Sequence, residues 1–292
     1  MPDIGVVLSG LASGVLLGGM LALTALGLSI VLGVMRLVNL AHGVFLVFGA
    51  YVGLYFLTYT GVDPLLGLPL VALFVGALAL PLHRFLLAPL AERGSEAQMM
   101  TMFAVAIIAE NLFVLGFSAD TRSIARDYAT LPLVLGPVTV PLIYAIGFAI
   151  SVTLIGLVHA LITRTAFGRD LRASAADPQA AATLGVDVGR TQRLTFALGA
   201  ACAAVGGVLI GSAFQFGPSS GGDYLLNSLA VVVLGGLGNV LGTLIGGLVL
   251  GVLQGAGGLV FGDGYRDRVG MAVFLLVLAF RPAGLWTRGR SL

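Results

Sequence analysis

The length of the uncharged apolar runs limits the fold of this chain more than any other feature. Residues 6–34 contain no charged side chain, and residues 43–58 and 240–261 are also apolar and uncharged. About 20 apolar residues in a helix span the roughly 30 Å hydrocarbon layer of a membrane. Only 10% of the residues are charged, against about 25% in a soluble domain. The sequence therefore predicts an all-α, polytopic helical membrane protein.

The order of the apolar segments predicts one transmembrane domain over residues 1–292, with about eight to nine transmembrane helices. One or two of these helices should be short or broken. Residues 225–237 reach only about 20 Å as a helix, and the polar residues 35–42 interrupt the first helix pair. The predicted segments lie near 6–34, 43–58, 65–82, 99–118, 141–163, 195–216, 225–237, 240–261 and 269–280.

The arginines predict the orientation, because short cytoplasmic loops carry an excess of basic residues. With the N-terminus outside, eleven arginines fall inside and four outside, and the opposite orientation reverses this bias. We therefore expect an N-terminus outside and a C-terminus in the cytoplasm, in a bacterial inner membrane. The inside arginines are Arg36, Arg84, Arg93, Arg164, Arg169, Arg172, Arg190, Arg193, Arg281, Arg288 and Arg290; the outside ones are Arg122, Arg126, Arg266 and Arg268.

The absence of lysine excludes several chemistries, since all 15 basic residues are arginine. A P-loop needs a lysine against the nucleotide phosphates, and Schiff-base catalysis needs a lysine amine. The histidines are not spaced for a metal site, and Cys202 is the single cysteine. We expect no catalytic residue, no metal, no cofactor and no nucleic-acid partner. If ATP drives this protein, another subunit must bind it.

Residues 164–193 form the most polar inside loop, with the sequence RTAFGRDLRASAADPQAAATLGVDVGRTQR. Asp177 before Pro178 is typical of a helix N-cap followed by proline at the first helical position. Gly185 is typical of a helix C-terminus, and Asp187 is expected to begin the next helix. The loop is predicted to form two short helices that dock into a groove of a partner. The alternative is an amphipathic helix that rests on lipid.

Polar residues cluster in MRLVNLAHGVF, residues 35–45, between two apolar runs. In one interpretation, Asn39, His42 and Gly43 lie beside a transport pathway at the cytoplasmic end of the first helix pair. In the other, Asn39 caps the second helix while His42 and Arg36 satisfy freed backbone groups. The sequence leaves both open.

Glu110 is the one acidic residue deep within an apolar span, and Asn111 follows it. A charge at the centre of a membrane helix costs about 2.5–3.5 kcal/mol on insertion scales. Such residues generally face a cavity or a partner. Glu110 is therefore a candidate for the transport pathway or a subunit interface, although pairing with an arginine or protonation would also explain it.

Three stretches resemble one family, the branched-chain amino acid ABC importer permeases, and specifically the shorter of their two membrane subunits. These stretches are ALTALGLSIVLGVMRLVNLAHGVFLVFGAYVG (22–53), GRDLRASAADPQAAATLGVDVGRTQRLTFALGAACAAVGGVL (168–209) and AVVVLGGLGNVLGTLIGGLVLG (230–251). The resemblance implies a second permease subunit, two cytoplasmic ATPases that bind ATP, and a periplasmic solute-binding protein.

The resemblance also implies that the loop 164–193 is the element that couples the permease to an ATPase. In one respect the chain departs from the family, which usually has Ala-Glu-Asp where this chain has Ala175, Ala176 and Asp177. The matching loop positions, and so the candidate coupling residues, are Gly168, Arg169, Arg172, Ala176, Asp177, Gly185 and Arg190.

The leading hypothesis is thus the membrane subunit of an ATP-driven importer for leucine, isoleucine and valine, without enzyme activity of its own. Related permeases for urea, short amides or aromatic acids remain alternatives for the solute. An ion-coupled secondary transporter that uses Glu110 and broken helices is an alternative of another class. A weaker alternative is an intramembrane hydrolase around Ser219 or His159, because GPSSG (217–221) matches the nucleophile-elbow pattern without its strand or partners.

Overall fold

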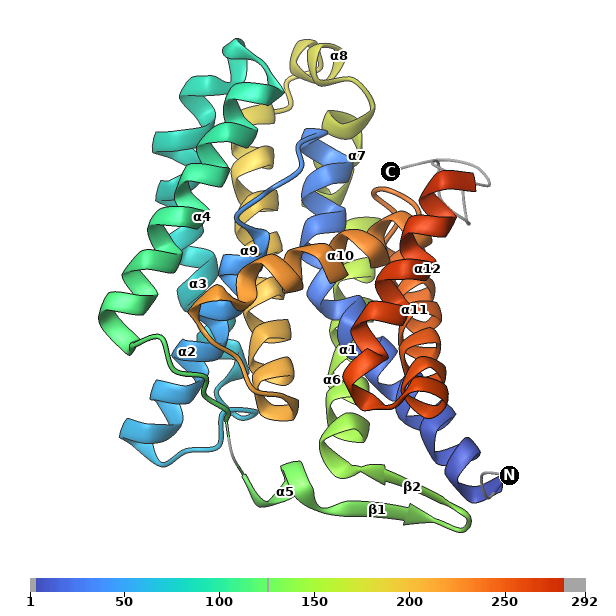
Figure 1. Cartoon of the computed structure of the whole chain (residues 1–292). Coiled ribbons are helices and arrows are strands. Elements are labelled where there is room, and N and C mark those ends of the chain that lie inside the picture. The colour runs from blue at the N-terminus through green and yellow to red at the C-terminus, as the bar shows by residue number, and fades with distance from the viewer. Residues whose placement is uncertain (1–3, 125, 281–292) are drawn as a thin grey trace.

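The computed structural model describes residues 4–124 and 126–280, and the predicted inside arginines Arg281, Arg288 and Arg290 lie outside this range. The chain is a bundle of helices with one small hairpin of strands (Figure 1). The elements are α1 (Ile4–Met35), α2 (His42–Thr60), α3 (Leu68–Leu82), α4 (Ser95–Phe117), α5 (Asp127–Thr130), β1 (Pro132–Leu135), β2 (Val138–Pro141), α6 (Leu142–Arg164), α7 (Ala166–Ala176), α8 (Pro178–Thr183), α9 (Val188–Ala213), α10 (Gly221–Gly235), α11 (Val240–Phe261) and α12 (Arg266–Phe280).

Seven helices of the described chain are long and apolar enough to cross a membrane: α1, α2, α3 with its extension to Arg93, α4, α6, α9 and α11. Helices α10 and α12 add two shorter apolar helices of 15 residues each. The prediction of a polytopic helical protein with some short helices is confirmed. The β1–β2 hairpin was not predicted; its four-residue strands pair antiparallel around a tight turn in which Gly136 has a φ of +62°.

The two ends of the bundle differ in structure. One end carries α7 and α8 and is called here the helical-loop end; the other carries β1 and β2 and is called the hairpin end (Figure 1). At the hairpin end, the Tyr128 hydroxyl donates to Asp63 at 3.0 Å, and Arg126 donates to the Gly61 carbonyl at 2.9 Å. Burial and the neighbouring Asp63 carboxylate raise the pKa of Tyr128 above its ordinary value, so this phenol keeps its proton.

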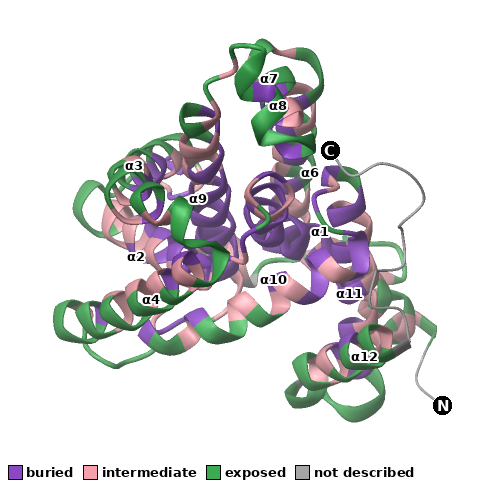
Figure 2. Cartoon of the chain, turned by 90° about the horizontal axis from the view of Figure 1, so that it is seen from above, coloured by how far each residue is buried: buried purple, intermediate pink, exposed green. Residues whose placement is uncertain are grey.

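Helix α1 lies at the centre of the bundle and is buried along most of its length (Figure 2). Glycines allow its backbone to approach neighbouring helices closely, as is common in membrane helix pairs. A Cβ added at Gly18 would lie 2.6 Å from the Gly247 carbonyl of α11, and one at Gly14 would lie 2.7 Å from the Gly251 carbonyl. The glycines of residues 235–258 therefore serve helix packing, as expected from their spacing.

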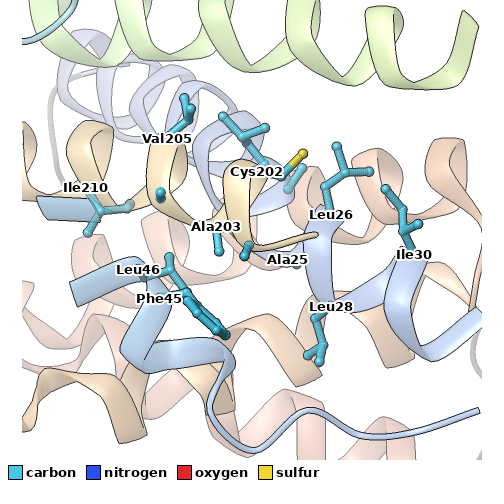
Figure 3. Packing of buried hydrophobic residues seen from close by; sticks show 14 of the residues in the cluster. Ala25, Leu26, Leu28, Ile30, Phe45, Leu46, Cys202, Ala203, Val205 and Ile210 are labelled. Carbon is cyan, nitrogen blue, oxygen red and sulfur yellow. The ribbon is translucent and has the colours of Figure 1, made fainter. Parts of the chain in front are cut away.

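Helix α9 packs against both α1 and α2 in the core. Figure 3 shows buried side chains of this region: Leu26, Leu28 and Ile30 of α1, Phe45 and Leu46 of α2, and Ala203 of α9. These side chains are 7% exposed or less. The small residues of α9 leave room for the larger ones of α1 and α2, so three helices pack without a polar layer between them.

Two segments of the chain interrupt simple membrane crossing. After α1 ends at the helical-loop end, residues 36–41 turn back into the bundle, and α2 begins inside it (Figure 1). Helix α10 likewise begins inside the bundle, where its Gly221 lies against Gly43 at the start of α2. Its following turn, residues 236–239, brings Gly238 against Gly33 near the end of α1. The short helix predicted at 225–237 is confirmed, with the boundaries Gly221–Gly235.

Candidate functional site

The main cavity of the described chain lies between α1, α2, α6, α9, α10, α11 and α12 and has a volume of about 620 Å³. This volume falls within the roughly 300–1,000 Å³ typical of small-molecule sites. Its lining residues are Leu17, Leu21, Thr24, Leu46, Tyr144, Ile210, Phe214, Gln215, Ser220, Asp223, Tyr224, Asn227, Gln254, Arg266 and Asp267. Seven elements contribute to it, so a relative movement of these helices would change its shape.

The cavity combines an aliphatic wall with a group of charged and amide side chains. Leu17, Leu21, Leu46 and Ile210 form the aliphatic part. The polar part comes from the beginning of α10 and α12 and from the middle of α11, where Gln254 donates to the Asn227 amide oxygen at 3.4 Å. The charged residues of the polar part are Asp223, Arg266 and Asp267.

Arg266 has a donor group that the protein does not use. Its Nε atom is buried and has no hydrogen-bond partner among the described residues. Buried polar atoms are nearly always paired, so an unpaired one next to a cavity calls for an explanation such as a bound group. A guanidinium is well suited to hold a carboxylate. The cavity therefore offers a cation for an anionic group and two carboxylates for a cationic group.

The inner wall of the cavity is a helix backbone held by a histidine. Thr24 lines the cavity, and its carbonyl oxygen lies 2.7 Å from Nε2 of His42, the first residue of α2. The His42 side chain is 2% exposed. Thr24 precedes Met35 by eleven residues, so this contact lies about 16 Å inside the end of α1 at 1.5 Å per residue.

The predicted position of His42, at the cytoplasmic end of the first helix pair, is therefore wrong, since residues 36–41 carry the chain inward. Asn39 is buried, and its side-chain oxygen accepts from the Ala41 backbone N–H at 3.0 Å, in a local turn before α2 rather than as its N-cap. Gly43 packs against Gly221. Of the two interpretations left open, the structure agrees with the structural one in that His42 and Arg36 contact backbone carbonyls, whereas Asn39 does not cap α2. His42 lies directly behind the cavity wall, and a role beside a transport pathway stays a prediction.

Glu110 and Asn111 lie on α4, away from the cavity. Helix α4 is the least buried of the seven long helices, Glu110 is half-buried, and Asn111 is exposed and donates to the Ile107 carbonyl of its own helix. Among the described residues, Glu110 has no ion-pair partner. The structure therefore places these two residues at the outer surface of the single chain and not at the cavity.

The loop between α6 and α9 has the helices that its sequence predicts. The Asp177 carboxylate caps α8 by accepting from the backbone N–H groups of Gln179 and Ala180, at 2.9 and 3.1 Å. Gly185 has a φ of +87°, which favours glycine after a helix. Asp187 caps α9 by accepting from the Arg190 N–H at 2.8 Å. The two-helix prediction is confirmed, and α7 is longer than expected, with 11 residues.

Of the remaining candidate residues of the loop, Gly168 and Arg172 contact α6, and Arg169 and Ala176 are exposed to solvent. Gly168 lies against the Ile162 carbonyl of α6, and the Arg172 guanidinium donates to that same carbonyl. Arg169 and Ala176 are exposed. A groove of about 480 Å³ at this surface is lined by Phe167, Asp170, Leu184, Gly185, Val186, Asp187, Arg190, Thr191 and Leu194. The loop thus presents a shaped, mixed-charge groove at the helical-loop end.

Sequence reasoning missed most polar residues of the cavity. Asp223 and Asn227 are four positions apart, a spacing that places them on one face of a helix, but Asp223 was assigned to a break before the segment 225–237. Gln254 is the single amide within the apolar run 240–261 and was passed over. Arg266 was counted only as an outside arginine, and Asp267 was not considered. Ser219 lies exposed in a single turn of 3-10 helix, and no hydrogen bond links it to a histidine in the described part of the chain.

These features define a class: a multi-pass membrane protein with a solute-sized amphipathic cavity and a helical loop at one end. The comparisons with known proteins make this specific. The family described as branched-chain amino acid transport system / permease component matches residues 10–280. The chain belongs to this family, as its sequence resemblance predicts, and the family consists of permease components of transport systems.

Individual relatives extend over nearly the whole chain. The chain is 29% identical to the high-affinity branched-chain amino acid transport system permease protein BraD of Pseudomonas aeruginosa, over 99% of this chain and 98% of that protein. It is 31% identical to the corresponding protein LivH of Escherichia coli K12, over 94% of each chain. The fructose import permease protein FrcC of Rhizobium meliloti is 34% identical, but over only 38% of this chain and 33% of its own. No solved structure matches the chain.

Proposed function

We propose that this chain is the membrane-spanning permease subunit of an ABC importer that carries leucine, isoleucine, valine or related small amphipathic solutes across the inner membrane. The observation that carries the proposal is the cavity, because it pairs an aliphatic wall with opposite charges. Full-length similarity to the permease proteins BraD and LivH supports it. In this proposal the chain breaks no bond, and separate ATPase subunits bind and hydrolyse ATP.

The chemistry of an aliphatic amino acid fits the two parts of the cavity. The solute carboxylate would bind the unused Nε donor of Arg266. Its ammonium would lie near Asp223 or Asp267, and its side chain would contact the leucines of α1. An amide or urea would satisfy Asn227 and Gln254 but would leave the charges unpaired. The buried Nε of Arg266 would then stay without a partner, which is costly for a buried donor, so Arg266 favours a solute with a carboxylate over urea or short amides.

The orientation of the chain follows from its arginines. The end of α1, the extension of α3 to Arg93, the end of α6, α7 and the beginning of α9 lie at the helical-loop end (Figure 1). By sequence, the arginines in or next to these segments are Arg36, Arg84, Arg93, Arg164, Arg169, Arg172, Arg190 and Arg193. We infer from this bias that the helical-loop end is cytoplasmic and the N-terminus outside. The groove at Asp187 and Arg190 would then receive an ATPase subunit, and the hairpin end would face a periplasmic solute-binding protein.

A second permease subunit would complete the passage. Half-buried Glu110 lies on α4, the long helix least covered by the rest of the chain. A charge facing lipid at this depth is unfavourable, so we infer that a protein partner covers this face of α4. Glu110 is in this view an interface residue and not a solute ligand.

The decisive experiment is reconstitution into proteoliposomes. The chain is purified with its second permease subunit, its two ATPases and its binding protein, and uptake of a panel of labelled amino acids, urea, amides, aromatic acids and sugars is measured. We expect ATP-dependent uptake of leucine, isoleucine or valine that vanadate inhibits. Uptake without the ATPases, abolished by ionophores and indifferent to vanadate, would instead establish an ion-coupled secondary transporter.

A further inference from the structure

Arg36 connects two parts of the chain that are 139 residues apart in sequence. Its guanidinium donates to the backbone carbonyls of Ala175 and Ala176, at 3.3 and 3.4 Å. These carbonyls belong to the last turn of α7, where helix carbonyls lack partners and carry partial negative charge. A cation at this position stabilises the end of α7 and ties it to the end of α1.

The backbone at Arg36 has a conformation that arginine rarely adopts. Its φ is +51°, and its N–H bonds to the Leu32 carbonyl at 3.0 Å, so it is the left-handed residue that ends α1. Glycine is the usual residue at such a position, because side chains with a Cβ are strained there. Only Arg36 and Ser118 are non-glycine residues with positive φ in the described chain. An arginine here is unfavourable for the backbone, which points to a use for its side chain.

The segment that follows Arg36 leads directly to the cavity. Arg36 is exposed, but Leu37, Asn39 and Ala41 are all 3% exposed or less, so one side of residues 37–41 packs into the bundle while Val38 and Leu40 are half-buried. They end at His42, whose ring contacts the Thr24 carbonyl in the cavity wall. A displacement of Arg36 therefore has a short, packed connection to the inner wall of the cavity.

We propose that Arg36 is a positioning residue that transmits the movement of the helical loop to the inner wall of the cavity. When a partner shifts α7, the two hydrogen bonds to the α7 carbonyls displace the Arg36 guanidinium. The backbone at Arg36 then acts as a hinge and moves residues 37–42 against Thr24. Helix α7 also packs on α1 and on α9, and α9 packs on α2, but the contact of Arg36 is the one that a side-chain substitution can remove without altering these helix packings. This inference rests on the proposed function, because it requires an ATPase to move the loop.

The test compares two glycine substitutions in the complete transporter in proteoliposomes. Arg36→Gly removes the guanidinium and relieves the backbone, so it should assemble normally. Ser118→Gly relieves the other non-glycine residue with a positive φ in the described chain, at the end of α4 and away from the loop, and serves as the control. Assembly, uptake, ATP hydrolysis, and hydrogen–deuterium exchange of residues 37–42 and 166–176 are measured with and without vanadate-trapped nucleotide.

We expect Arg36→Gly to lower uptake by about tenfold, within the range of couplings between distant sites, while ATP hydrolysis continues. Nucleotide trapping should still alter exchange at 166–176 but no longer at 37–42. Wild type and Ser118→Gly should respond in both segments. Normal uptake by Arg36→Gly, a retained response at 37–42, or failure of this variant to assemble would each overturn the inference. Absence of ATP-dependent uptake by the wild type would instead overturn the proposed function.

Discussion

The imidazole of His42 contacts the carbonyl oxygen of Thr24 at 2.7 Å, although a simple hairpin would leave the first residue of α2 beside the end of α1, eleven residues from Thr24. The contact exists because residues 36–41 return into the bundle before α2 begins. It joins the cavity wall to the segment that leads to the helical loop. The transport proposal depends on this geometry, and four further experiments examine its parts.

Removal of the His42 ring should destabilise the protein and impair transport. His42→Ala leaves a buried space and removes a contact of a fully enclosed polar group, and such losses cost about 1–3 kcal/mol. Thermal unfolding of the purified chain in detergent should show a lower Tm, and uptake should fall. The exposed Asn111 on α4 offers a control, since Asn111→Ala should leave Tm nearly unchanged. Equal Tm values for His42→Ala and wild type would show that the contact contributes nothing.

Asp223 should matter for solute affinity rather than for assembly. Asp223→Asn keeps the size of the side chain but removes a carboxylate from the cavity, which weakens the attraction for an ammonium group. We expect a higher KM for uptake of the cognate amino acid, by about tenfold for a lost charged contact, with normal expression. Asp120→Asn, at an exposed acid outside the cavity lining, is the control. An unchanged KM would remove Asp223 from the solute site.

Close glycine packing between α1 and α11 should tolerate no methyl group. A Cβ at position 18 would lie 2.6 Å from the Gly247 carbonyl and 2.8 Å from the Leu248 Cα, both backbone atoms. We expect Gly18→Ala to destabilise the chain by about 1–3 kcal/mol, as overpacking does, seen as a lower Tm in detergent.

Gly116 of α4 supplies the matched control for Gly18, because a Cβ there meets no atom within 4 Å. Gly116→Ala should be neutral or stabilising by up to about 1 kcal/mol, since alanine favours helix more than glycine does. If both alanine variants have the same Tm, close approach at Gly18 is not what holds the two helices together.

The cap of α8 should be needed for coupling but not for insertion into the membrane. Asp177→Ala removes both hydrogen bonds to the first turn of this six-residue helix, and a lost cap costs about 1 kcal/mol. Gly185→Pro forbids the φ of +87° observed there and should act more strongly. We expect normal membrane levels and reduced ATP-driven uptake for both. Full uptake with either substitution would mean that α8 does not transmit movement.

Much of this protein could be predicted from local features of its sequence. Long apolar runs must form helices in a membrane, because the backbone can satisfy its hydrogen bonds in no other way within a single segment. The caps at Asp177 and Asp187 and the glycine at 185 were readable because such a cap involves residues two or three positions apart. The resemblance in three stretches was also sufficient to indicate the family.

Only the tertiary structure decided where the polar residues meet. Asp223, Gln254 and Arg266 come from three helices, and no local pattern says that their side chains line one cavity with Leu17 and Leu21. The same holds for Glu110. The free-energy cost of a charge within an apolar membrane helix identified it as a candidate, but its place on the outer face of α4 depends on how the helices pack. The inward return of residues 36–41 likewise depends on tertiary contacts, of His42 with α1 and of Gly43 with α10. A polar interruption in the sequence carries no information on its depth in the bundle.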